Sequence, residues 1–140
     1  MHKNPIVIIE DDQDDCDLLV HAFEDLGIKN ELKFFQNGLE ALAYLKATDD
    51  RAFLILSDVN MPLMNGMDLK KTIYKDERLR KQTIPFVFFS TSSRPKEILQ
   101  AYEMMVQGYF IKSNDFENLK ALLKVIIDYW KVCRHPNSVN

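Results

Sequence analysis

The sequence has little of several features that mark other classes of protein. Its 140 residues include two cysteines, Cys16 and Cys133, which are too few for a disulfide framework. The chain opens without an apolar signal segment, so we expect free thiols and a cytoplasmic location. No apolar run is long enough to cross a bilayer. The net charge of −3 argues against a general nucleic-acid binder, and three scattered histidines argue against a transition-metal site.

Short apolar runs alternate along the chain with segments of helical spacing. The apolar runs predict strands at residues 5–9, 31–35, 53–56, 85–89 and 109–111. Apolar residues three and four apart predict helices through residues 16–26, 39–45, 69–73, 98–105 and 114–130. The alternation predicts one α/β domain, a parallel sheet covered by helices on both faces. We expect the domain to cover residues 1–134 and residues 135–140, which lack apolar periodicity, to form a disordered tail.

Local signals predict where some of these segments end. Gly27 is placed to end the first helix, because glycine readily adopts the left-handed conformation after a helix C-terminus. Asn114 is predicted to begin the last helix, with Glu117 three residues on as its capping partner. Residues 76–83 are highly charged and are expected to form a connection between the third helix and the fourth strand.

Polar side chains follow four of the predicted strands: Glu10 and Asp11 the first, Asp58 the third, Ser90 the fourth and Lys112 the fifth. The ends of parallel strands lie along one edge of the sheet. Three carboxylates brought together repel one another unless their pKa values rise or a cation such as Mg²⁺ binds among them. Lys112 and Ser90 would offer a positive charge and a hydrogen bond to a phosphoryl group. Asp58 is the natural acceptor, because an aspartate carries phosphoryl as an acyl phosphate.

These residues resemble the receiver domain of two-component response regulators. The resemblance covers residues 5–131, and its motifs stand in the family's order: Glu10-Asp11, Asp58 with Met61-Pro62 and Gly66, then Ser90, then Lys112. It implies a flavodoxin-like, doubly wound (βα)5 sheet with strand order 2-1-3-4-5. The chain looks like a single-domain, CheY-like receiver. The connection DERLRKQTIP and the hydroxyl run after the fourth strand are similar to a subgroup that partners phytochrome-type kinases.

The resemblance also implies ligands, partners and a mechanism. Mg²⁺ would be bound by Asp11, Asp58 and the main-chain carbonyl of Asn60, with Glu10 acting through water. Phosphoryl would come from a sensor histidine kinase or a histidine phosphotransfer protein. The output would be a change in affinity for an unknown protein, or a homodimer, through the face of the fourth helix, fifth strand and fifth helix. Because no linker or further segment interrupts the alternation and no apolar run is long enough to cross a bilayer, we expect no DNA-binding domain and no contact with a membrane.

The resemblance assigns roles to the residues around the phosphoryl group as well. Lys112 would pair with the phosphoryl group, and Ser90 would move toward it after transfer. Tyr109 matches the aromatic residue that the family couples to this movement. Two positions depart from the family: Ser113 replaces the proline that usually follows the lysine, and Thr91 replaces a smaller residue. The bulk of Thr91 is a candidate modulator of access to Asp58.

Other interpretations stay open at this point. An aspartyl-phosphate phosphatase also uses a strand-end aspartate, but it needs a second acid where Asn60 stands, so we expect a switch that is no enzyme beyond its own phosphorylation and dephosphorylation. A phosphate-independent adaptor with the same fold is a second alternative.

Asp12 is equally suited to cap a helix or to join the metal shell, whereas Asp15 is expected to favour the helix N-terminus. The basic stretch at residues 70–81 is expected to be a solvated face or to meet an acidic partner.

Overall fold

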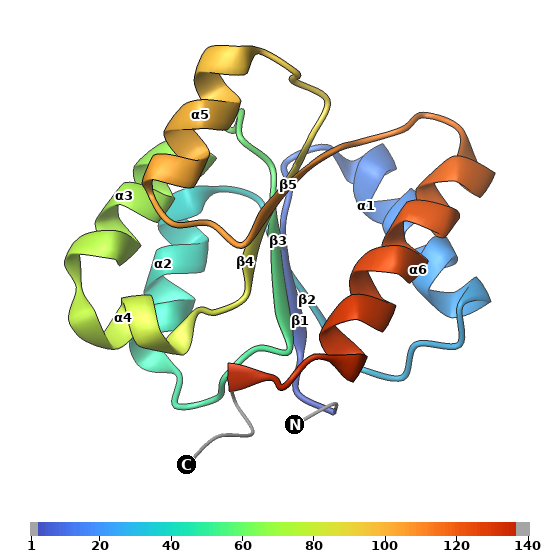
Figure 1. The fold of residues 1–140 in the computed structure, drawn as a ribbon, viewed down its shortest axis with the longest axis horizontal. Helices are drawn as coiled ribbons and strands as arrows, with labels where there is room; N and C mark the ends of the chain where they lie inside the picture. The colour runs from blue at the N-terminus through green and yellow to red at the C-terminus, as the bar shows by residue number, and fades with distance from the viewer. Residues whose placement is uncertain (1–2, 137–140) are drawn as a thin grey trace.

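The three central strands are buried along their whole length, as a parallel sheet between two helical layers requires. The computed structural model describes residues 3–136, in which five parallel strands lie in the order β2-β1-β3-β4-β5 (Figure 1). The strands are β1 (Ile6–Ile9), β2 (Leu32–Phe35), β3 (Leu54–Ser57), β4 (Phe86–Ser90) and β5 (Gly108–Ile111). The predicted flavodoxin-like fold and strand order are confirmed.

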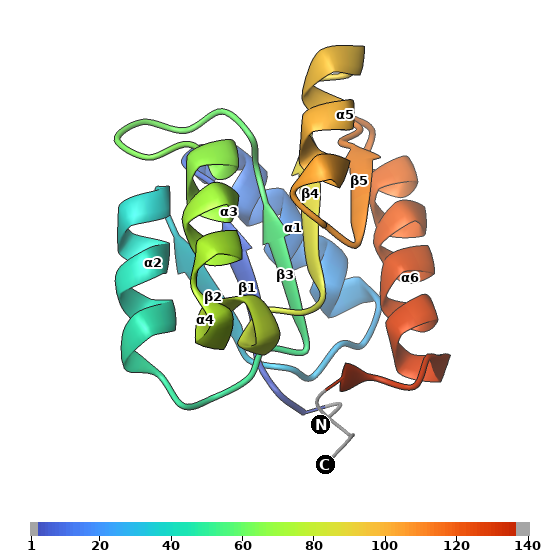
Figure 2. The ribbon, with the colours of Figure 1, turned by 60° about the vertical axis from the view of Figure 1, so that its left-hand side comes forward.

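Helices cover both faces of the sheet, α1 and α6 on one side and α2 to α5 on the other (Figures 1 and 2). The helices are α1 (Gln13–Asp25), α2 (Gly38–Ala47), α3 (Gly66–Lys75), α4 (Glu77–Gln82), α5 (Pro95–Glu103) and α6 (Phe116–Val132). Side chains alternate between the faces of a strand. Val7 and Ile9 therefore pack with α2 to α5, whereas Ile6 and Ile8 pack with α1 and α6.

The charged segment after α3 folds as a short helix, α4, where the sequence predicts a connection. The Asp76 side chain accepts a hydrogen bond from the Leu79 N–H at 3.0 Å, and Leu79 is buried against the sheet. Arg78 donates to the carbonyl oxygens of Lys46 and Thr48 at 3.2 and 2.9 Å. A cap, one buried leucine and a tie to the end of α2 therefore hold a helix that has no apolar periodicity.

Two predicted helix ends have different outcomes. Gly27 follows α1 with a positive φ of 69°, so its predicted role is confirmed. The last helix is capped by Asp115 instead of Asn114, because the Asp115 carboxylate accepts from the Asn118 N–H at 2.9 Å. A carboxylate at this position also interacts favourably with the helix dipole.

The described chain stays ordered beyond residue 134, where the sequence predicts the domain to end. His135 is fully buried, its Nε2 lies 2.7 Å from the carbonyl oxygen of Phe53, and the two rings stack with centroids 5.2 Å apart. The expectation of disorder is therefore wrong for His135, and residues 137–140 of the expected tail lie outside the described residues.

Both cysteines are free, as predicted. No helix within residues 3–136 has the length and apolar character needed to span a membrane.

Candidate functional site

Three carboxylates meet where the two central strands β1 and β3 end. Ile9 pairs with Ser57 in the sheet, so the residues that follow, Glu10 and Asp58, leave the sheet side by side. One oxygen atom from each of Glu10, Asp11 and Asp58 lies within 4.8 Å of the others. The structure thus brings together the three acids that the sequence places at strand ends.

Lys112 joins this group from the end of β5. Its backbone N–H donates to the Ser90 carbonyl at 2.8 Å, which extends the pairing of β4 with β5 and directs the side chain toward the acids. The ammonium forms a close ion pair with Glu10, and its Nζ lies 3.2 Å from Asp15 Oδ2 and 3.8 Å from Asp58 Oδ2. The lysine side chain is 7% exposed and that of Glu10 4%, so this is a buried charge network.

Burial determines the protonation of this network. Desolvation raises the pKa of Glu10 to about 7, against the opposing effect of Lys112. Burial alone would lower the pKa of Lys112, but the hydrogen bond to Glu10 and the charges of Asp58 and Asp15 outweigh it, and the pKa of Lys112 is raised. Lys112 therefore stays protonated at neutral pH and offers a fixed positive charge beside Asp58.

The backbone holds Asp58 in one orientation. Asp58 N–H donates to the Ile9 carbonyl at 2.9 Å, and Asp58 Oδ1 accepts from the Val59 N–H at 2.7 Å. Gly66 packs directly on this segment: a Cβ atom there would lie 2.2 Å from the Asp58 carbonyl oxygen. Oδ2 lies 3.8 Å from the Lys112 ammonium, and the side chain of Asp58 keeps 14% exposure, so the carboxylate is in contact with solvent.

Ser90, the last residue of β4, and Tyr109, in β5, are linked through Ser92. The fully buried Ser90 hydroxyl oxygen accepts from the Ser92 N–H at 3.1 Å. The Tyr109 hydroxyl donates to the Ser92 carbonyl at 2.8 Å. Burial raises the pKa of Tyr109, so the hydroxyl keeps its proton. A displacement of Ser90 would therefore alter the segment on which the Tyr109 hydroxyl is held.

The donor set fits a hard divalent cation. Carboxylate oxygens are the ligands that Mg²⁺ and related ions prefer, and a cation among three acids removes the repulsion between them. Asp11 is exposed and therefore accessible to an ion from solvent.

Asn60 and Thr91 are exposed in the segments after β3 and β4, and their roles stay predictions. Within residues 3–136 the only cis peptide bond is Ile84–Pro85, so the bond from Lys112 to Ser113 is trans.

Sequence reasoning missed one member of the charge network. Asp15 lies in the first turn of α1, as predicted, but its carboxylate also pairs with Lys112, which the sequence does not predict. Asp12 is the actual cap, because its Oδ1 accepts from the Asp15 N–H at 3.1 Å, and its own N–H donates to Glu10. The position of Asp15 in the sequence was the available indication, because it lies in the first turn of a helix that begins three residues after Glu10.

Comparison with known proteins identifies the family. Residues 6–124 match the response regulator receiver domain. The chain is 33% identical to the probable methanogenesis regulatory protein FilR2 of Methanothrix harundinacea, over 89% of this chain and 82% of that protein. It is 30% identical to the chemotaxis protein CheY1 of Helicobacter pylori strain 26695, over 87% of this chain and 95% of that protein.

Solved structures agree with this match. The phosphorylated cyanobacterial phytochrome response regulator RcpA has a TM-score of 0.82 and 30% identity, covering 91% of this chain and 94% of that one. The Mn²⁺-bound form of response regulator Rcp1 has a TM-score of 0.80 and 27% identity, with the same coverage. The chain therefore belongs to the response regulator receiver domain family.

Proposed function

We propose that this protein is a phosphorylation switch of two-component signalling whose Asp58 accepts a phosphoryl group from a sensor histidine kinase or a histidine phosphotransfer protein. The position of Asp58 carries the proposal. Its carboxylate is accessible, lies within 4.8 Å of Glu10 and Asp11, and faces a buried lysine. The family assignment supports a signalling role without turnover of a metabolite. The two cysteines of the chain are free, which supports a reducing, cytoplasmic setting.

The proposed transfer makes Asp58 the nucleophile. A carboxylate oxygen of Asp58 bonds to the phosphorus of the donor as the phosphorus–nitrogen bond to the histidine breaks, and the imidazole leaves with the bonding electrons. The Lys112 ammonium compensates the negative charge on the phosphoryl oxygens. To reach them, it gives up part of its contact with the carboxylates of Glu10 and Asp15. Water then attacks the acyl phosphate, which releases inorganic phosphate and returns the carboxylate.

Glu10, Asp11 and Asp58 are the residues that would hold Mg²⁺, with the Asn60 carbonyl as a further ligand. When bound, the cation would neutralise the charge of the acids and of the incoming phosphoryl oxygens. The close approach of the three carboxylates supports this assignment, as does the Mn²⁺-bound form of the similar Rcp1. Glu10 lies deepest and is paired with Lys112, so we propose that it acts through water.

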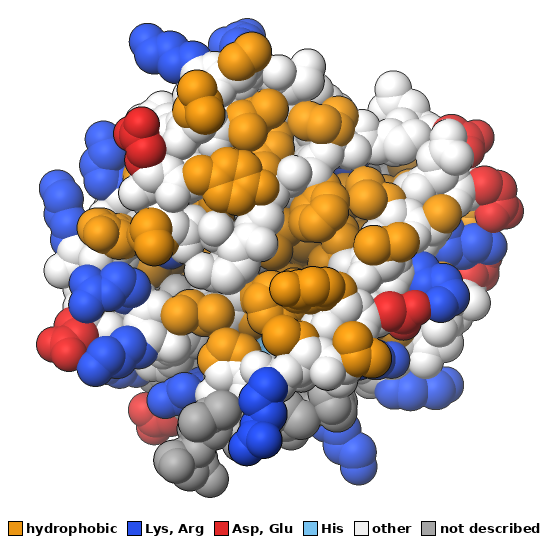
Figure 3. All heavy atoms as spheres, in the orientation of Figure 1, with side chains coloured by type: hydrophobic (Ala, Val, Ile, Leu, Met, Phe, Trp, Pro, Cys, Tyr) orange, Lys and Arg blue, Asp and Glu red, His pale blue; other side chains and the backbone are white. Residues whose placement is uncertain are grey.

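The signal leaves the site through Ser90 and Tyr109. Phosphorylation draws the Ser90 hydroxyl toward the phosphoryl group, which disturbs the Ser92 segment that holds the Tyr109 hydroxyl. Tyr109 also lines a hollow of about 270 Å³ whose other walls include Tyr102 and Tyr129. Figure 3 shows apolar side chains gathered on this face, between α5 and α6. We propose that the α5–β5–α6 face binds a downstream protein or a second copy of the chain.

Intact mass spectrometry tests the proposal. The wild type and Asp58→Asn are incubated with acetyl phosphate, with and without Mg²⁺. We expect a phosphoryl adduct only in the wild type with Mg²⁺, and we expect hydroxylamine to remove it because acyl phosphates are labile to this nucleophile. An adduct on Asp58→Asn would contradict the assignment of the acceptor.

A second experiment separates restricted access of the small donor from the phosphate-independent adaptor. If no adduct forms although Mg²⁺ binds, a purified histidine phosphotransfer protein replaces acetyl phosphate as the donor. Thr91→Ala is the matched variant in that arm, since it shortens the side chain next to Ser90 without touching a proposed ligand. Failure of both donors with both proteins would favour a phosphate-independent adaptor.

A further inference from the structure

A buried lysine lies on the α3 side of the sheet, away from the acidic site. Lys70 is only 2% exposed, and its Nζ lies over the ring of Phe86, 5.4 Å from the centroid. Among the described residues its ammonium has no carboxylate partner and no hydrogen bond. Phe86 is the first residue of β4, whereas Asp58 follows the last residue of β3, so the two sites lie toward opposite ends of the parallel strands.

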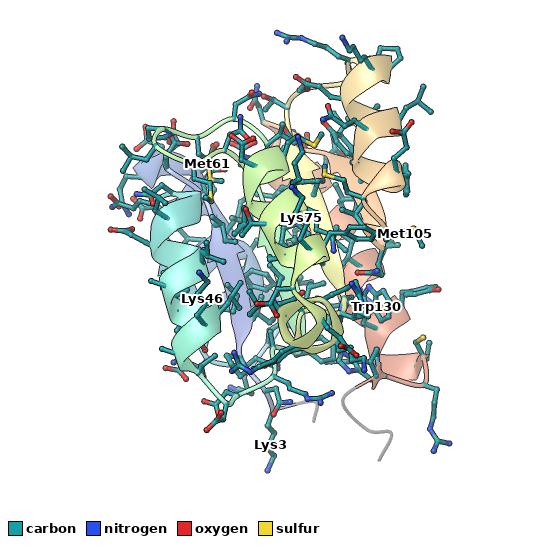
Figure 4. All side chains as sticks on the ribbon, turned by 90° about the vertical axis from the view of Figure 1, so that its left-hand side faces the viewer. Lys3, Lys46, Met61, Lys75, Met105 and Trp130 are labelled. Carbon is teal, nitrogen blue, oxygen red and sulfur yellow. The ribbon has the colours of Figure 1, made fainter. Side chains whose placement is uncertain are left out.

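Lys70 lines a surface cavity of about 320 Å³. The cavity is bounded by α3, by α4 and by the connection from α5 to β5, and Figure 4 views this side, with Lys75 and Met105 labelled on two of these elements. Its volume is in the range of small-ligand sites. The cavity exists because α4 lies beside α3, the same short helix that the sequence did not predict.

The cavity wall is positively charged. Arg80 and Lys81 of α4 line it together with Lys70, and the residues that line it include no acid. Arg80 donates from Nη1 to the Tyr74 carbonyl at 2.9 Å, which holds its guanidinium at the rim. Lys81 is paired with the exposed Glu77, so its charge is partly compensated. Burial, together with the smaller effect of the nearby charge of Arg80, lowers the pKa of Lys70 to about 8.

The remainder of the wall is apolar or already bonded. Ile84, Met105 and the ring of Tyr74 present carbon atoms to the cavity. Gln107 is engaged on both sides: its Oε1 accepts from the Phe86 N–H at 2.7 Å and its Nε2 donates to the Met105 carbonyl at 2.8 Å. A buried ammonium without an anionic partner is unfavourable, and a contact with the face of a phenylalanine compensates for it only in part. An anion with an apolar body complements this wall.

We propose that this cavity is a binding site for a small phosphate monoester with an apolar group, with the Lys70 ammonium as its central contact. A phosphate monoester carries up to two negative charges, which matches a wall with three cationic side chains better than a single carboxylate does. The guanidinium of Arg80 contacts the phosphate from the rim, since its planar donors suit phosphate geometry. The apolar group lies against Ile84 and Met105.

Nuclear magnetic resonance with phenyl phosphate as the probe tests the site. The full chain carries Asp58→Asn and is kept without Mg²⁺, so that the acidic site neither accepts phosphoryl nor binds metal-bridged phosphate. Binding is followed through the Lys70 side-chain signals and through the backbone amides of Ile84 and Met105. Inorganic phosphate and phenol are titrated separately as the charged and apolar halves of the probe.

Lys70→Met is compared with Lys71→Met, which removes a charge from an exposed neighbour on the same helix. Methionine keeps the length of the lysine stem over Phe86, so we expect Lys70→Met to fold. We expect saturable shifts at the three positions, binding weakened about tenfold or more by Lys70→Met, and no loss with Lys71→Met.

Three results would overturn the proposal. The first is a titration that does not saturate at these positions, and the second is equal affinity in the two methionine variants. The third is a response centred on Lys112 instead of Lys70. If Lys70→Met does not fold, the titration of the parent protein alone still decides, because the Lys70 signals either saturate with phenyl phosphate or they do not.

Discussion

Gly66 shows how the absence of a side chain fixes the position of Asp58, the proposed acceptor. A Cβ at this position would lie 2.2 Å from the Asp58 carbonyl oxygen and 2.8 Å from the ring of Phe88, so either the backbone of the Asp58 segment or α3 would have to move. We predict that Gly66→Ala lowers the free energy of unfolding by about 1–3 kcal/mol. Urea unfolding measures this loss.

The same substitution should slow phosphorylation, because Asp58 shifts relative to Lys112 while both side chains remain. The control is Lys71→Ala, an exposed position on the same helix, which should leave both quantities near the wild type. A Gly66→Ala protein of wild-type stability and phosphorylation rate would show that the segment relaxes freely.

Glu10 gives the site a dependence on pH. Burial raises its pKa from 4.5 to about 7, so between these values the folded protein holds a proton that the unfolded chain has lost. In metal-free protein the free energy of unfolding should therefore fall as pH rises through this window, by on the order of 3 kcal/mol from this group. Thermal unfolding in chelator at several pH values measures the slope.

Mg²⁺ should act in the opposite sense, because it requires ionised carboxylates. We expect the increase in Tm on adding Mg²⁺ to be larger near pH 8 than near pH 5. Glu10→Gln is the control: it removes the titrating group, so the slope of the metal-free protein should flatten. A Tm increase independent of pH would place the ion away from these acids.

Among the elements, α4 depends on very few contacts. Leu79 is its one buried residue and Asp76 its cap. We predict that Leu79→Ala destabilises the protein by about 2–5 kcal/mol and Asp76→Ala by about 1 kcal/mol. Lys81→Ala, at an exposed position of the same helix, should have an effect within about 0.5 kcal/mol. Chemical denaturation measures all three, and equal losses for Leu79 and Lys81 would mean that α4 contributes little packing.

The elements also show what is readable from the sequence. Runs such as Phe53–Leu56 predict strands because a buried parallel strand is apolar on both faces, and the acids that follow them predict the site edge. A six-residue helix with a single apolar contact shows no periodicity, so α4 was not predicted. His135 is not predicted for a similar reason: its contacts include the carbonyl and the ring of Phe53, far away in the sequence, which no pattern in the neighbouring tail indicates.

The site was predictable in its members but not in its pairing. The strand ends bring Glu10, Asp58 and Lys112 to one edge, which follows from topology alone. That Lys112 pairs with Glu10 and Asp15 more closely than with Asp58 depends on the first turn of α1 and on side-chain directions. Such distances are set by tertiary packing, which sequence spacing does not encode.

At the scale of the whole molecule, the α5–β5–α6 face is the surface that we propose for output. Tyr102, Val125 and Tyr129 are 48%, 63% and 57% exposed around the hollow that Tyr109 lines. Apolar side chains gathered at this density on one face are typical of binding surfaces. The face is also the one connected to Ser90 through the Tyr109 hydroxyl and Ser92.

If a second copy occupies this face, the oligomeric state should follow phosphorylation. We predict that sedimentation of the phosphorylated protein shows dimers as concentration rises, and that Tyr129→Glu weakens the dimer about tenfold or more by placing charge in the apolar contact. Leu39→Glu is the matched control, since Leu39 is 48% exposed on α2, which contacts β2 at the edge of the sheet opposite β5. Dimers that resist Tyr129→Glu would place the interface elsewhere. If the phosphorylated protein stays monomeric, a second copy does not occupy the face. The proposed occupant is then a different downstream protein, because movement of Tyr109 would still change the surface of the α5–β5–α6 face.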